Sequence, residues 1–526
     1  MGFTAFKTPE SLFLVRGSER IEVGLGSGNR DFATIAWRAS GLTPASATHR
    51  SYLTVAIYFI AQDARAVEDV SWSFVDENKC VFFPQGDAEG RLLHITPDGV
   101  KRTRMSQAKV PAVAGVEFEP FEYVEQDGGI DQVSNAFRWT SLPPDERMVL
   151  VHWLVALPLL RRIGTIPIMR IEGGSGSGKT RTVDAVSWLV NGRDCSSVPT
   201  AAALASRLAR EMLTIDDNRE STDVTPAMLG TLLQATQLGA RSKRKINSDT
   251  GTVVERVAGA LLMNGVEPIH NGKSELASRM LTIRCSRDYM SVDSPRSESE
   301  LHNALLAARD SFWSEAARRC AAVMRMDKLH GGRFSAAIEE AFGATRIGRM
   351  SVYLRAMVFA WIAGKPESEQ QDLLDAGLPP CWRAVFGKLS ESAMSSLVAE
   401  ELAVVAVEYA FAFARSVAEA ESQYGSVAVA VDGKYQHDLD KGDEALGEIG
   451  ARQLARLARE AGKQLNAPWA VTHALRAGQL EQRILDGQEF LRAAGYEVEA
   501  RRANSGRWRF TFYRHGEGGQ AVAPPA

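Results

Sequence analysis

The chain has 526 residues, of which 45% are hydrophobic, and a formal net charge of −3. This length allows more than one buried core, and we expect about three domains. A nearly neutral charge excludes a protein that coats nucleic acid by bulk charge, so any DNA contact must come from local basic patches.

Targeting and redox features are typical of a cytoplasmic protein that does not enter a membrane. The N-terminal sequence MGFTAFKTPE has no basic region followed by an apolar stretch, which argues against a secretory signal. The longest apolar stretch, residues 149–160, is shorter than the roughly 20 residues that a membrane helix needs. The five cysteines lie far apart, with no CxxC pair and no cysteine–histidine cluster at metal-ligand spacing, so we expect reduced thiols.

The N-terminal part of the chain combines a helical pattern with a strand-like one. Residues 48–66 carry apolar side chains at helical spacing. From Trp72 to about Val124 the pattern changes to short strands around the turn Pro97-Asp98-Gly99. We therefore expect an α+β accessory domain over residues 1–141.

The rest of the chain divides by composition. A prolyl start and an apolar body predict a buried helix over residues 142–160, with a strand at 166–171. After Arg287 the sequence is rich in alanine and leucine, which predicts a helical region. Two amphipathic helices before two alternating strands indicate a winged helix near the C-terminus. The expected boundaries are 142–290 for an α/β core domain, 291–420 for the helical domain, 421–448 for a linker, 449–514 for the winged helix and 515–526 for a disordered tail.

The most specific motif is GGSGSGKT, which satisfies the P-loop pattern G-x-x-x-x-G-K-[ST] between a predicted strand and a predicted helix. The glycines let backbone N–H groups converge on phosphate oxygens, Lys179 reaches the β and γ phosphates, and Thr180 can ligate Mg²⁺. The motif therefore predicts an ATP site formed by Gly173, Gly174, Ser175, Gly176, Ser177, Gly178, Lys179 and Thr180.

Two acidic residues, Asp216 and Asp217, end the predicted strand EMLTIDD. Carboxylates at a strand tip can hold the water shell of the metal ion and orient the attacking water. We expect Asp216 to serve the metal ion together with Thr180. Two alternatives stay open: the register can pair Asp217 with Asn218 instead, or the acids can cap a helix.

A third predicted strand, VAGALLMN, ends at Asn264, just before Gly265. An amide at this position can hydrogen-bond the γ-phosphate or the attacking water and so sense the nucleotide state. Asn-Gly is also a common turn, which is the alternative interpretation.

A basic segment precedes this strand. The sequence ARSKRKINSDTGTVVERV predicts two strands around a tip at residues 247–251, and four of the five residues from Arg241 to Lys245 are cationic. Such a hairpin can hold the phosphates of a nucleic acid strand, or it can be a solvated strand face. Arg279, between a polar loop and the next strand, can reach the γ-phosphate on a neighbouring subunit, although surface arginines without such a role are common.

Several segments, taken in their order and spacing, resemble the AAA+ type ATPase of superfamily-three helicases. These segments are EGGSGSGKT, MLTIDDN, RSKRKINSDTG, and ALLMNGVEP with LASRMLTI. The chain resembles in particular the primase-associated, phage- and plasmid-type ATP-binding proteins of bacteria, over about residues 30–290. It implies a multidomain α/β protein with a P-loop AAA+ ATPase core, assembled as a homo-oligomeric ring, usually a hexamer, with ATP at subunit interfaces. It also implies that Asn264 is the sensor, that Arg279 is the arginine finger, and that the hairpin grips single-stranded DNA in a central pore through Lys243, Arg244 and Lys245.

The expected function is an ATP-dependent DNA helicase or translocase, with ATP and Mg²⁺ as cofactors, that serves replication of a phage, plasmid or other mobile element. No primase-type segment precedes the ATPase in this sequence, so a separate primase or replication initiator is an expected partner. Further DNA contacts are expected in the winged helix, whose basic face can also be a protein-docking surface. The candidate DNA-binding residues are Arg241, Lys243, Arg244, Lys245, Arg501, Arg502, Arg507 and Arg509. The alternative function is an ATP-switched DNA-binding regulator or an anti-phage defence ATPase without unwinding activity.

Overall fold

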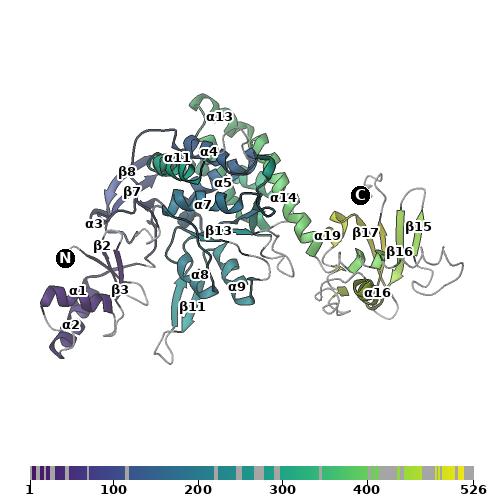
Figure 1. Ribbon diagram of the computed structural model, residues 1–526, viewed down its shortest axis with the longest axis horizontal. Helices are drawn as coiled ribbons and strands as arrows, with labels where there is room; N and C mark the ends of the chain where they lie inside the picture. Colours follow the sequence, from purple (N-terminus) through teal and green to yellow (C-terminus); the bar gives the residue numbers. More distant parts are fainter. Residues whose placement is uncertain are drawn as a thin grey trace. The chain divides into compact units, whose positions relative to one another are not determined.

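A computed structural model gives the fold, with helices and strands labelled in Figure 1. The chain forms two compact units: the first joins Met1–Pro268 with Arg279–Ser390, and the second joins Ile269–Ser278 with Glu391–Ala526. None of the helices in the described part of the chain is long and apolar enough to cross a membrane. The structure describes all residues except 1–2, 8–11, 17–18, 24–29, 42–46, 68–69, 113–117, 218, 220–222, 245–251, 266–275, 277, 290–296, 343–345, 401–403, 405, 409, 413, 415–434, 439–442, 465–479, 482–483, 486–487, 504–506 and 515–526.

The first unit begins with a sheet that is buried on both faces, in the order β3-β2-β1-β4. Successive side chains of a strand point to opposite faces. Leu12 and Leu14 therefore pack on helices α1 and α2, whereas Phe13 and Val15 pack toward the following sheet. The elements are β1 (Thr4–Lys7), β2 (Leu12–Arg16), β3 (Glu19–Val23), α1 (Arg30–Ser40), α2 (Ala47–Asp63) and β4 (Arg65–Ala66).

The short strands expected after Trp72 are present as an antiparallel sheet in the order β5-β6-β7-β8. An aromatic cluster joins this sheet to the long helix α11 (Glu298–Phe342), because the ring of Trp313 lies 5.8 Å from that of Phe83 and 6.0 Å from that of Phe118. The elements are β5 (Phe74–Val75), β6 (Val81–Pro84), β7 (Arg91–Thr96), β8 (Gly99–Arg104) and α3 (Met105–Ala108).

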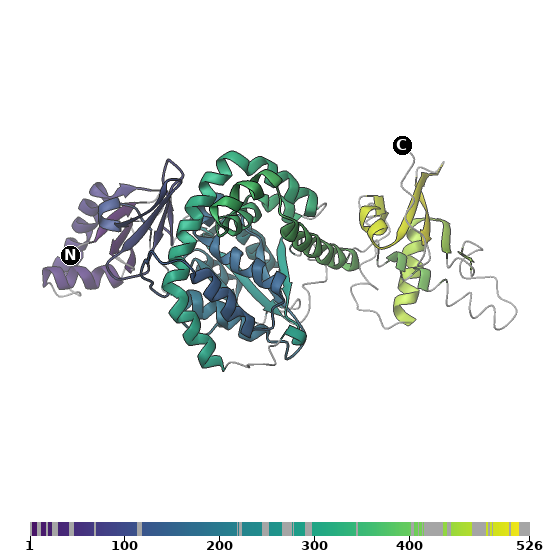
Figure 2. The ribbon, with the colours of Figure 1, turned by 90° about the horizontal axis from the view of Figure 1, so that it is seen from above.

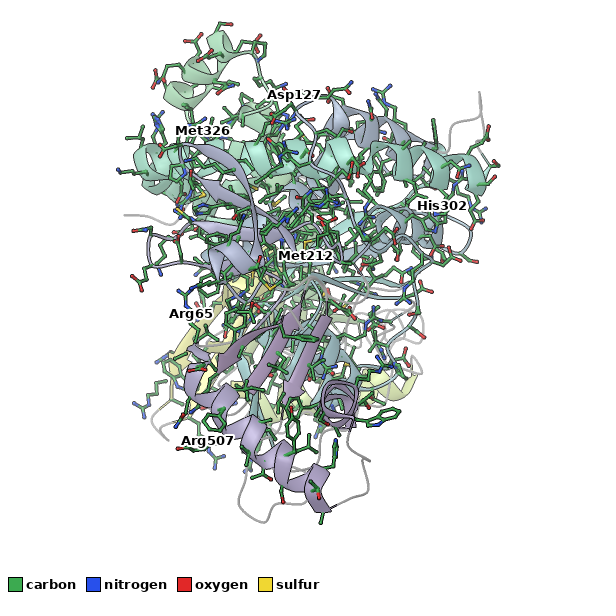
Figure 3. The ribbon with its side chains drawn as sticks, turned by 90° about the vertical axis from the view of Figure 1, so that its left-hand side faces the viewer. Arg65, Asp127, Met212, His302, Met326 and Arg507 are labelled. Atoms are coloured by element: carbon green, nitrogen blue, oxygen red, sulfur yellow. The ribbon has the colours of Figure 1, made fainter. Side chains whose placement is uncertain are left out.

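The central sheet of the first unit is parallel and has the order β10-β13-β9-β14. Every residue of β9, β10 and β13 is buried, as expected for a parallel sheet that is covered on both faces. Met212, just before β10, lies among the densely packed side chains of this unit (Figure 3). Because the strands are parallel, their carboxyl ends meet at one edge. The strands are β9 (Ile168–Glu172), β10 (Leu213–Asp216), β13 (Ala260–Gly265) and β14 (Met280–Arg284).

Helices surround this sheet. The helix expected over residues 142–160 is present as α5, followed by a short 3-10 turn at Leu157–Leu159 and by α6. Thr200 and Thr225 begin α8 and α9 by accepting hydrogen bonds from backbone N–H groups of the first turn. The helices are α4 (Gly129–Ala136), α5 (Pro144–Val155), α6 (Leu160–Ile163), α7 (Lys179–Asn191), α8 (Ala201–Leu208) and α9 (Pro226–Ala235).

The helical region expected after Arg287 is led by α11, which runs along the central body of the first unit (Figure 2). It packs on α4, α7 and α12 and on the sheet strands β7 and β8. The helices are α11 (Glu298–Phe342), α12 (Ser351–Ile362), α13 (Glu367–Ala376) and α14 (Pro380–Glu400).

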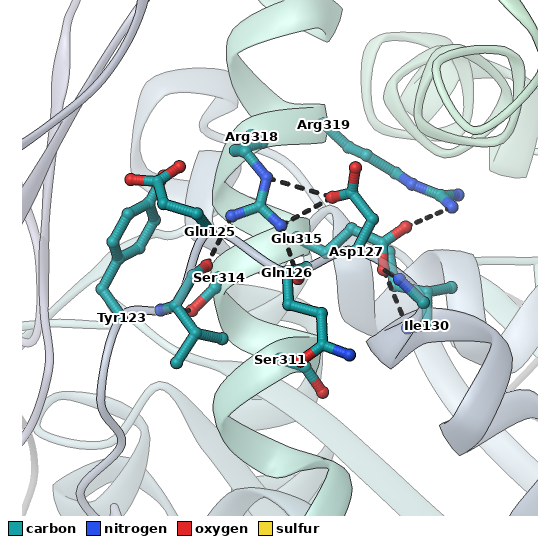
Figure 4. Close-up of polar contacts among 12 residues, drawn as sticks. Tyr123, Glu125, Gln126, Asp127, Ile130, Ser311, Ser314, Glu315, Arg318 and Arg319 are labelled. Atoms are coloured by element: carbon teal, nitrogen blue, oxygen red, sulfur yellow. Dashed lines mark hydrogen bonds and ion pairs between the residues drawn. The ribbon is translucent and has the colours of Figure 1, made fainter.

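Glu315 of α11 supplies acceptors for the start of α4. Its Oε2 accepts hydrogen bonds from the backbone N–H groups of Gly128, at 3.0 Å, and Ile130, at 3.1 Å (Figure 4). Arg319 Nη2 donates to the other carboxylate oxygen across 2.5 Å. The first N–H groups of a helix have no partner within the helix, so a carboxylate from another helix fixes the two helices together.

Arg309 of α11 supplies hydrogen-bond donors for the end of α7. Its guanidinium, 3% exposed, donates to the backbone carbonyl groups of Leu189, at 2.7 Å, and Val190, at 2.9 Å. It also donates to the carbonyl of Glu119. Burial lowers the pKa of Arg309 to about 10, which still leaves it charged at neutral pH. A buried cation at the carboxyl end of α7 satisfies its last carbonyl groups and opposes its negative dipole end.

The second unit contains an antiparallel sheet in the order β15-β16-β18-β17. The hairpin strands expected near the C-terminus are present as β17 and β18, and the aromatic side chains of Phe510 and Phe512 are buried in the core. The elements are β15 (Tyr435–Asp438), β16 (Asp443–Ile449), α16 (Ala451–Gln464), α19 (Gln488–Ala493), β17 (Tyr496–Arg502) and β18 (Trp508–Arg514).

Two of the expected boundaries are wrong. The segment 421–448 is not simply a linker, because β15 and most of β16 lie in it and extend the C-terminal sheet. The region expected to be one helical domain divides after Ser390, and Val407 and Phe411 belong to the core of the second unit. The expected tail, 515–526, lies outside the described residues.

Candidate active site

The glycine-rich loop, Gly173–Gly178, connects β9 to α7 at the carboxyl edge of the parallel sheet. Gly178 has φ +85°, and a Cβ at this position would lie 2.0 Å from Ser141 Oγ. A Cβ on Gly173 would lie 2.7 Å from the carbonyl oxygen of Cys285. Both positions therefore require glycine, one for its backbone angle and both for space.

Lys179 is the first residue of α7 and is only 7% exposed. Its Nζ donates to the carbonyl oxygen of Gly174 across 3.1 Å, and no carboxylate lies within 4.0 Å of it among the described residues. The hydroxyl of Ser177 is also buried and has no hydrogen-bond partner there. A buried cation without an acid, at the start of a helix and beside an unused hydroxyl donor, fits an anionic group such as a polyphosphate. Thr180, the next residue, is exposed.

Arg287 holds the outside of the glycine-rich loop. It lies in a 3-10 turn, Arg287–Tyr289, after β14. Its Nη2 donates to the carbonyl oxygen of Ser175 across 2.6 Å, and its Nε donates to that of Gly176 across 3.2 Å. These two hydrogen bonds fix the direction of two carbonyl groups of the loop, and the N–H of Ser177 donates to the carbonyl oxygen of Gly174 within the loop. Sequence reasoning missed this residue, because nothing in the sequence shows that it folds back onto a loop 111 positions earlier.

Asp216 ends β10 as a fully buried side chain in an ion pair with Arg219. Arg219 Nε donates to Oδ2 across 2.8 Å, and Arg219 Nη2 donates to Oδ1 across 3.1 Å. The backbone N–H of Val198 donates to Oδ1 across 2.9 Å. Both oxygens therefore have protein partners, and this carboxylate fixes the strand end and the loop at Val198. Arg219 was not predicted, and its position three residues after Asp216 is the signal that could have found it.

Asp217, the next residue, is half-buried and accepts a hydrogen bond at Oδ1 from Asn264 Nδ2 across 2.8 Å. Asn264 lies on β13, the strand between β10 and β9, and is paired in register with Ile171. The structure thus brings together two predicted site residues from different strands. It also places them at the edge of the sheet from which the glycine-rich loop leaves.

A second buried ion pair lies under this edge. Arg170 Nε donates to Glu172 Oε1 across 2.9 Å, and Arg170 Nη1 donates to the carbonyl oxygen of Arg219 across 3.1 Å. A Cβ on Gly265 would lie 2.4 Å from Arg170 Nη2, so the strand end of β13 is closely packed against this guanidinium. The carboxyl ends of β9, β10 and β13 are therefore joined by charged groups, which fix their positions relative to one another.

Two cysteines near the site remain neutral thiols. Burial raises the pKa of Cys285, beside the glycine-rich loop, to about 11. Burial, a hydrogen bond with Asp184 and the charge of Asp217 all raise the pKa of Cys195. Neither thiol adds a negative charge that would repel an anionic ligand.

Arg279 lies in the turn before β14 and is 9% exposed. Its Nη1 donates to Thr236 Oγ1 across 3.3 Å, and its carbonyl oxygen accepts from the backbone N–H of Ile168. In this single chain the side chain contacts its own unit. A role at the phosphate of a neighbouring subunit requires that the guanidinium leave Thr236.

The basic segment forms the two strands that were expected. The strand β11 (Ala240–Arg244) pairs antiparallel with β12 (Thr252–Arg256), and the register places Arg241 opposite Glu255 and Lys243 opposite Val253. Lys245 and the tip at 247–251 lie outside the described residues.

The C-terminal arginines lie on and beside the hairpin of the second unit. Arg501 and Arg509 are directly opposite in the pairing of β17 with β18, and Arg501, Arg502, Arg507 and Arg509 are all exposed. Like charges directly opposite destabilise a strand pair. Arg509 Nη1 also donates to Gln453 Oε1 of α16 across 3.5 Å. This cationic surface is a candidate for an anionic partner.

No protein-family model matches the chain, and no curated protein sequence matches it significantly. Among solved structures, it is similar to Cch of SCCmec type IV, described as an active helicase, with a TM-score of 0.52 and 11% identity over 97% of this chain and 92% of that chain. The chain shares the fold of a solved helicase. Two structures of the NrS-1 C-terminal region match with TM-scores of 0.39 and 0.40 and identities of 10% and 11%, and cover 98% and 97% of this chain and 96% of each of those chains.

Proposed function

We propose that the protein is an ATP-dependent DNA helicase or translocase. One observation carries this proposal. The glycine-rich loop leaves the parallel sheet at the same edge at which Asp217 and Asn264 form a hydrogen bond. Ligands of open parallel sheets bind at the carboxyl ends of the strands. The fold shared with Cch supports the helicase class.

Each residue then has a role in binding Mg²⁺-ATP or in hydrolysing the bond between its β- and γ-phosphates. The N–H groups of Gly173–Gly178 and the ammonium of Lys179 hold the phosphates, and Thr180 holds the metal ion. Asp217, oriented by Asn264, is the carboxylate that holds the water shell of the metal ion or positions the attacking water. We assign Asp216 the role of fixing the strand end, because Arg219 and Val198 already bind both of its oxygens.

The DNA contacts proposed for this activity are local, in keeping with a net charge of −3. The basic segment from Arg241 to Lys245 binds single-stranded DNA, and the exposed C-terminal arginines bind further phosphates. We propose a homo-oligomeric ring, a hexamer, in which Arg279 leaves Thr236 to reach the neighbouring ATP. We also propose that this ring serves a mobile element together with a separate primase or initiator.

Steady-state ATP hydrolysis with and without single-stranded DNA tests this proposal. We expect DNA to stimulate the wild type, Lys179→Ala to abolish turnover, and a Lys243/Arg244/Lys245→Ala triple variant to lose only the stimulation. A Lys328→Ala/Arg383→Ala variant, which removes exposed cations on α11 and α14, is the matched control and keeps the stimulation. If the rate of ATP hydrolysis is the same with and without DNA in every variant, the helicase proposal is contradicted and a nucleotide-controlled assembly switch is favoured.

A further inference from the structure

Three metal-binding side chains gather in the sheet β5-β6-β7-β8, outside the candidate active site. Asp76 and Cys80 lie at the two ends of the turn that joins β5 to β6, and His94 lies on β7, opposite Phe82 of β6. One ligand atom from each of the three lies within 4.8 Å of the other two. The spacing of these residues in the chain does not predict this cluster, because strand pairing brings His94 to the other two residues.

The carboxylate and the imidazole are oriented toward each other without a hydrogen bond between them. The backbone N–H of Cys80 donates to Asp76 Oδ1 across 2.8 Å, which leaves Oδ2 at 3.8 Å from His94 Nε2. This distance is longer than a hydrogen bond, and His94 Nε2 has no hydrogen-bond partner among the described residues. Nitrogen and oxygen ligands that share a tetrahedral ion lie about 3.3 Å apart, given metal–ligand bonds of about 2.0–2.1 Å. The observed spacing is thus close to that of two ligands of one ion.

The surroundings keep these side chains in place. The His94 ring stacks on Phe82, with ring centroids 4.2 Å apart and an interplanar angle of 4°. Cys80 is buried, and its Sγ makes a long contact, 3.9 Å, with the carbonyl oxygen of Asn78. The turn is also fixed from outside, since Arg162 of α6 donates to the carbonyl oxygen of Lys79. Little rearrangement is therefore needed for the thiol, the imidazole and the carboxylate to face one ion.

We propose that Asp76, Cys80 and His94 bind a divalent transition-metal ion, Zn²⁺, that fastens the β5–β6 turn to β7. A thiolate and an imidazole select Zn²⁺ over Mg²⁺ or Ca²⁺, which prefer oxygen ligands. Three protein ligands leave one position of a tetrahedral ion for a water molecule. The ion links β7 to the turn between β5 and β6, which Arg162 ties to α6, so it stabilises the folded chain.

The test uses the full chain, purified without chelator, and measures its zinc content by mass spectrometry. We expect about one Zn²⁺ per chain in the wild type and at least a tenfold loss of affinity in Cys80→Ser and His94→Gln. Cys381→Ser removes an exposed thiol on α14 and is the matched control, which retains the metal. Replacement by Co²⁺ gives the wild type a thiolate charge-transfer band in the near ultraviolet, and Cys80→Ser removes it.

Added zinc also raises the melting temperature of the chelator-treated wild type but not that of His94→Gln, because only the folded site binds the ion. His94→Gln and Asp76→Asn change partly exposed side chains, so they report on the site even if Cys80→Ser fails to fold. The proposal is overturned if the wild type binds zinc no more tightly than these variants, or if its Co²⁺ complex lacks the thiolate band.

Discussion

Asn264 Nδ2 donates a hydrogen bond to Asp217 Oδ1 across 2.8 Å, although the two residues are 47 positions apart in the chain. They lie at the carboxyl ends of two neighbouring strands, β13 and β10. The amide therefore fixes the direction of the carboxylate. A bond of this kind is useful in a site where one oxygen must face a metal ion or a water molecule while the other is held.

The pair predicts a defect in turnover rather than in nucleotide binding. Asp217→Asn and Asn264→Ala should each lower kcat for ATP by about 100-fold or more, because each removes a group that acts in the transition state. Nucleotide affinity, measured with a fluorescent ATP analogue, should change by less than about threefold. The double variant should be no slower than the slower single variant, since the two residues act as one unit. Asp372→Asn, an exposed acid on α13, is the control, and normal turnover in Asp217→Asn contradicts the assignment.

The adjacent acid, Asp216, should behave differently. Asp216→Asn leaves the buried guanidinium of Arg219 without its counter-charge, and breaking such a buried pair costs about 3–5 kcal/mol. Asp217→Asn is the matched comparison, because it changes the neighbouring half-buried side chain, and we expect it to cost less than about 1 kcal/mol. Urea unfolding of the full chain measures both. Equal losses of stability in the two variants would show that the ion pair with Arg219 does not contribute to the free energy of unfolding as proposed.

The sequence predicts the parts of the site that depend on local patterns. The glycine-rich loop, the acids at the end of β10 and Asn264 all follow short apolar strands, and a parallel sheet brings such strand ends to one edge. What the sequence could not show are partners that depend on the tertiary fold. Arg287 reaches the loop from a distant turn, and Arg309 reaches the end of α7 from more than 100 positions away.

The errors in the fold have the same physical origin. The strand β15 has the sequence YQHD, and β16 has DEALGEI, so both are polar enough to be interpreted as a linker. Their strand structure comes from pairing with each other and, for β16, with β18. Polar strands of this kind carry little apolar periodicity, and tertiary pairing decides their conformation.

Two glycines of the loop make a matched pair for a third prediction. Gly178→Ala puts a Cβ 2.0 Å from Ser141 Oγ at a residue with φ +85°, whereas a Cβ on Gly174 meets no atom within 4 Å. Gly178→Ala should therefore weaken nucleotide binding by about tenfold or more, through the strain that it places on the loop, and Gly174→Ala should stay within about threefold. Titration with a fluorescent ATP analogue measures both affinities. Similar losses in the two variants would contradict the role of backbone strain.

The last prediction concerns acid stability and the buried residue His152. Its Nδ1 lies 2.8 Å from the carbonyl oxygen of Met148, which can only accept, so Nδ1 carries a proton. Burial lowers the pKa of His152 to about 3, whereas an unfolded histidine has a pKa of about 6.5. Between these values the unfolded state binds a proton that the folded state does not. The stability from the neutral ring is thus complete above about pH 6.5 and falls as the pH is lowered, by up to about 1.4 kcal/mol per pH unit.

Urea unfolding at pH 7.5 and pH 5 checks this expectation. The wild type should lose about 2 kcal/mol more between these pH values than His152→Gln, whose amide can still donate to Met148 but does not titrate. The same comparison with His330→Gln, at a half-exposed histidine of α11, controls for a histidine outside the core. If His152→Gln loses as much stability as the wild type on acidification, the acid sensitivity comes from other groups and the buried imidazole does not set it.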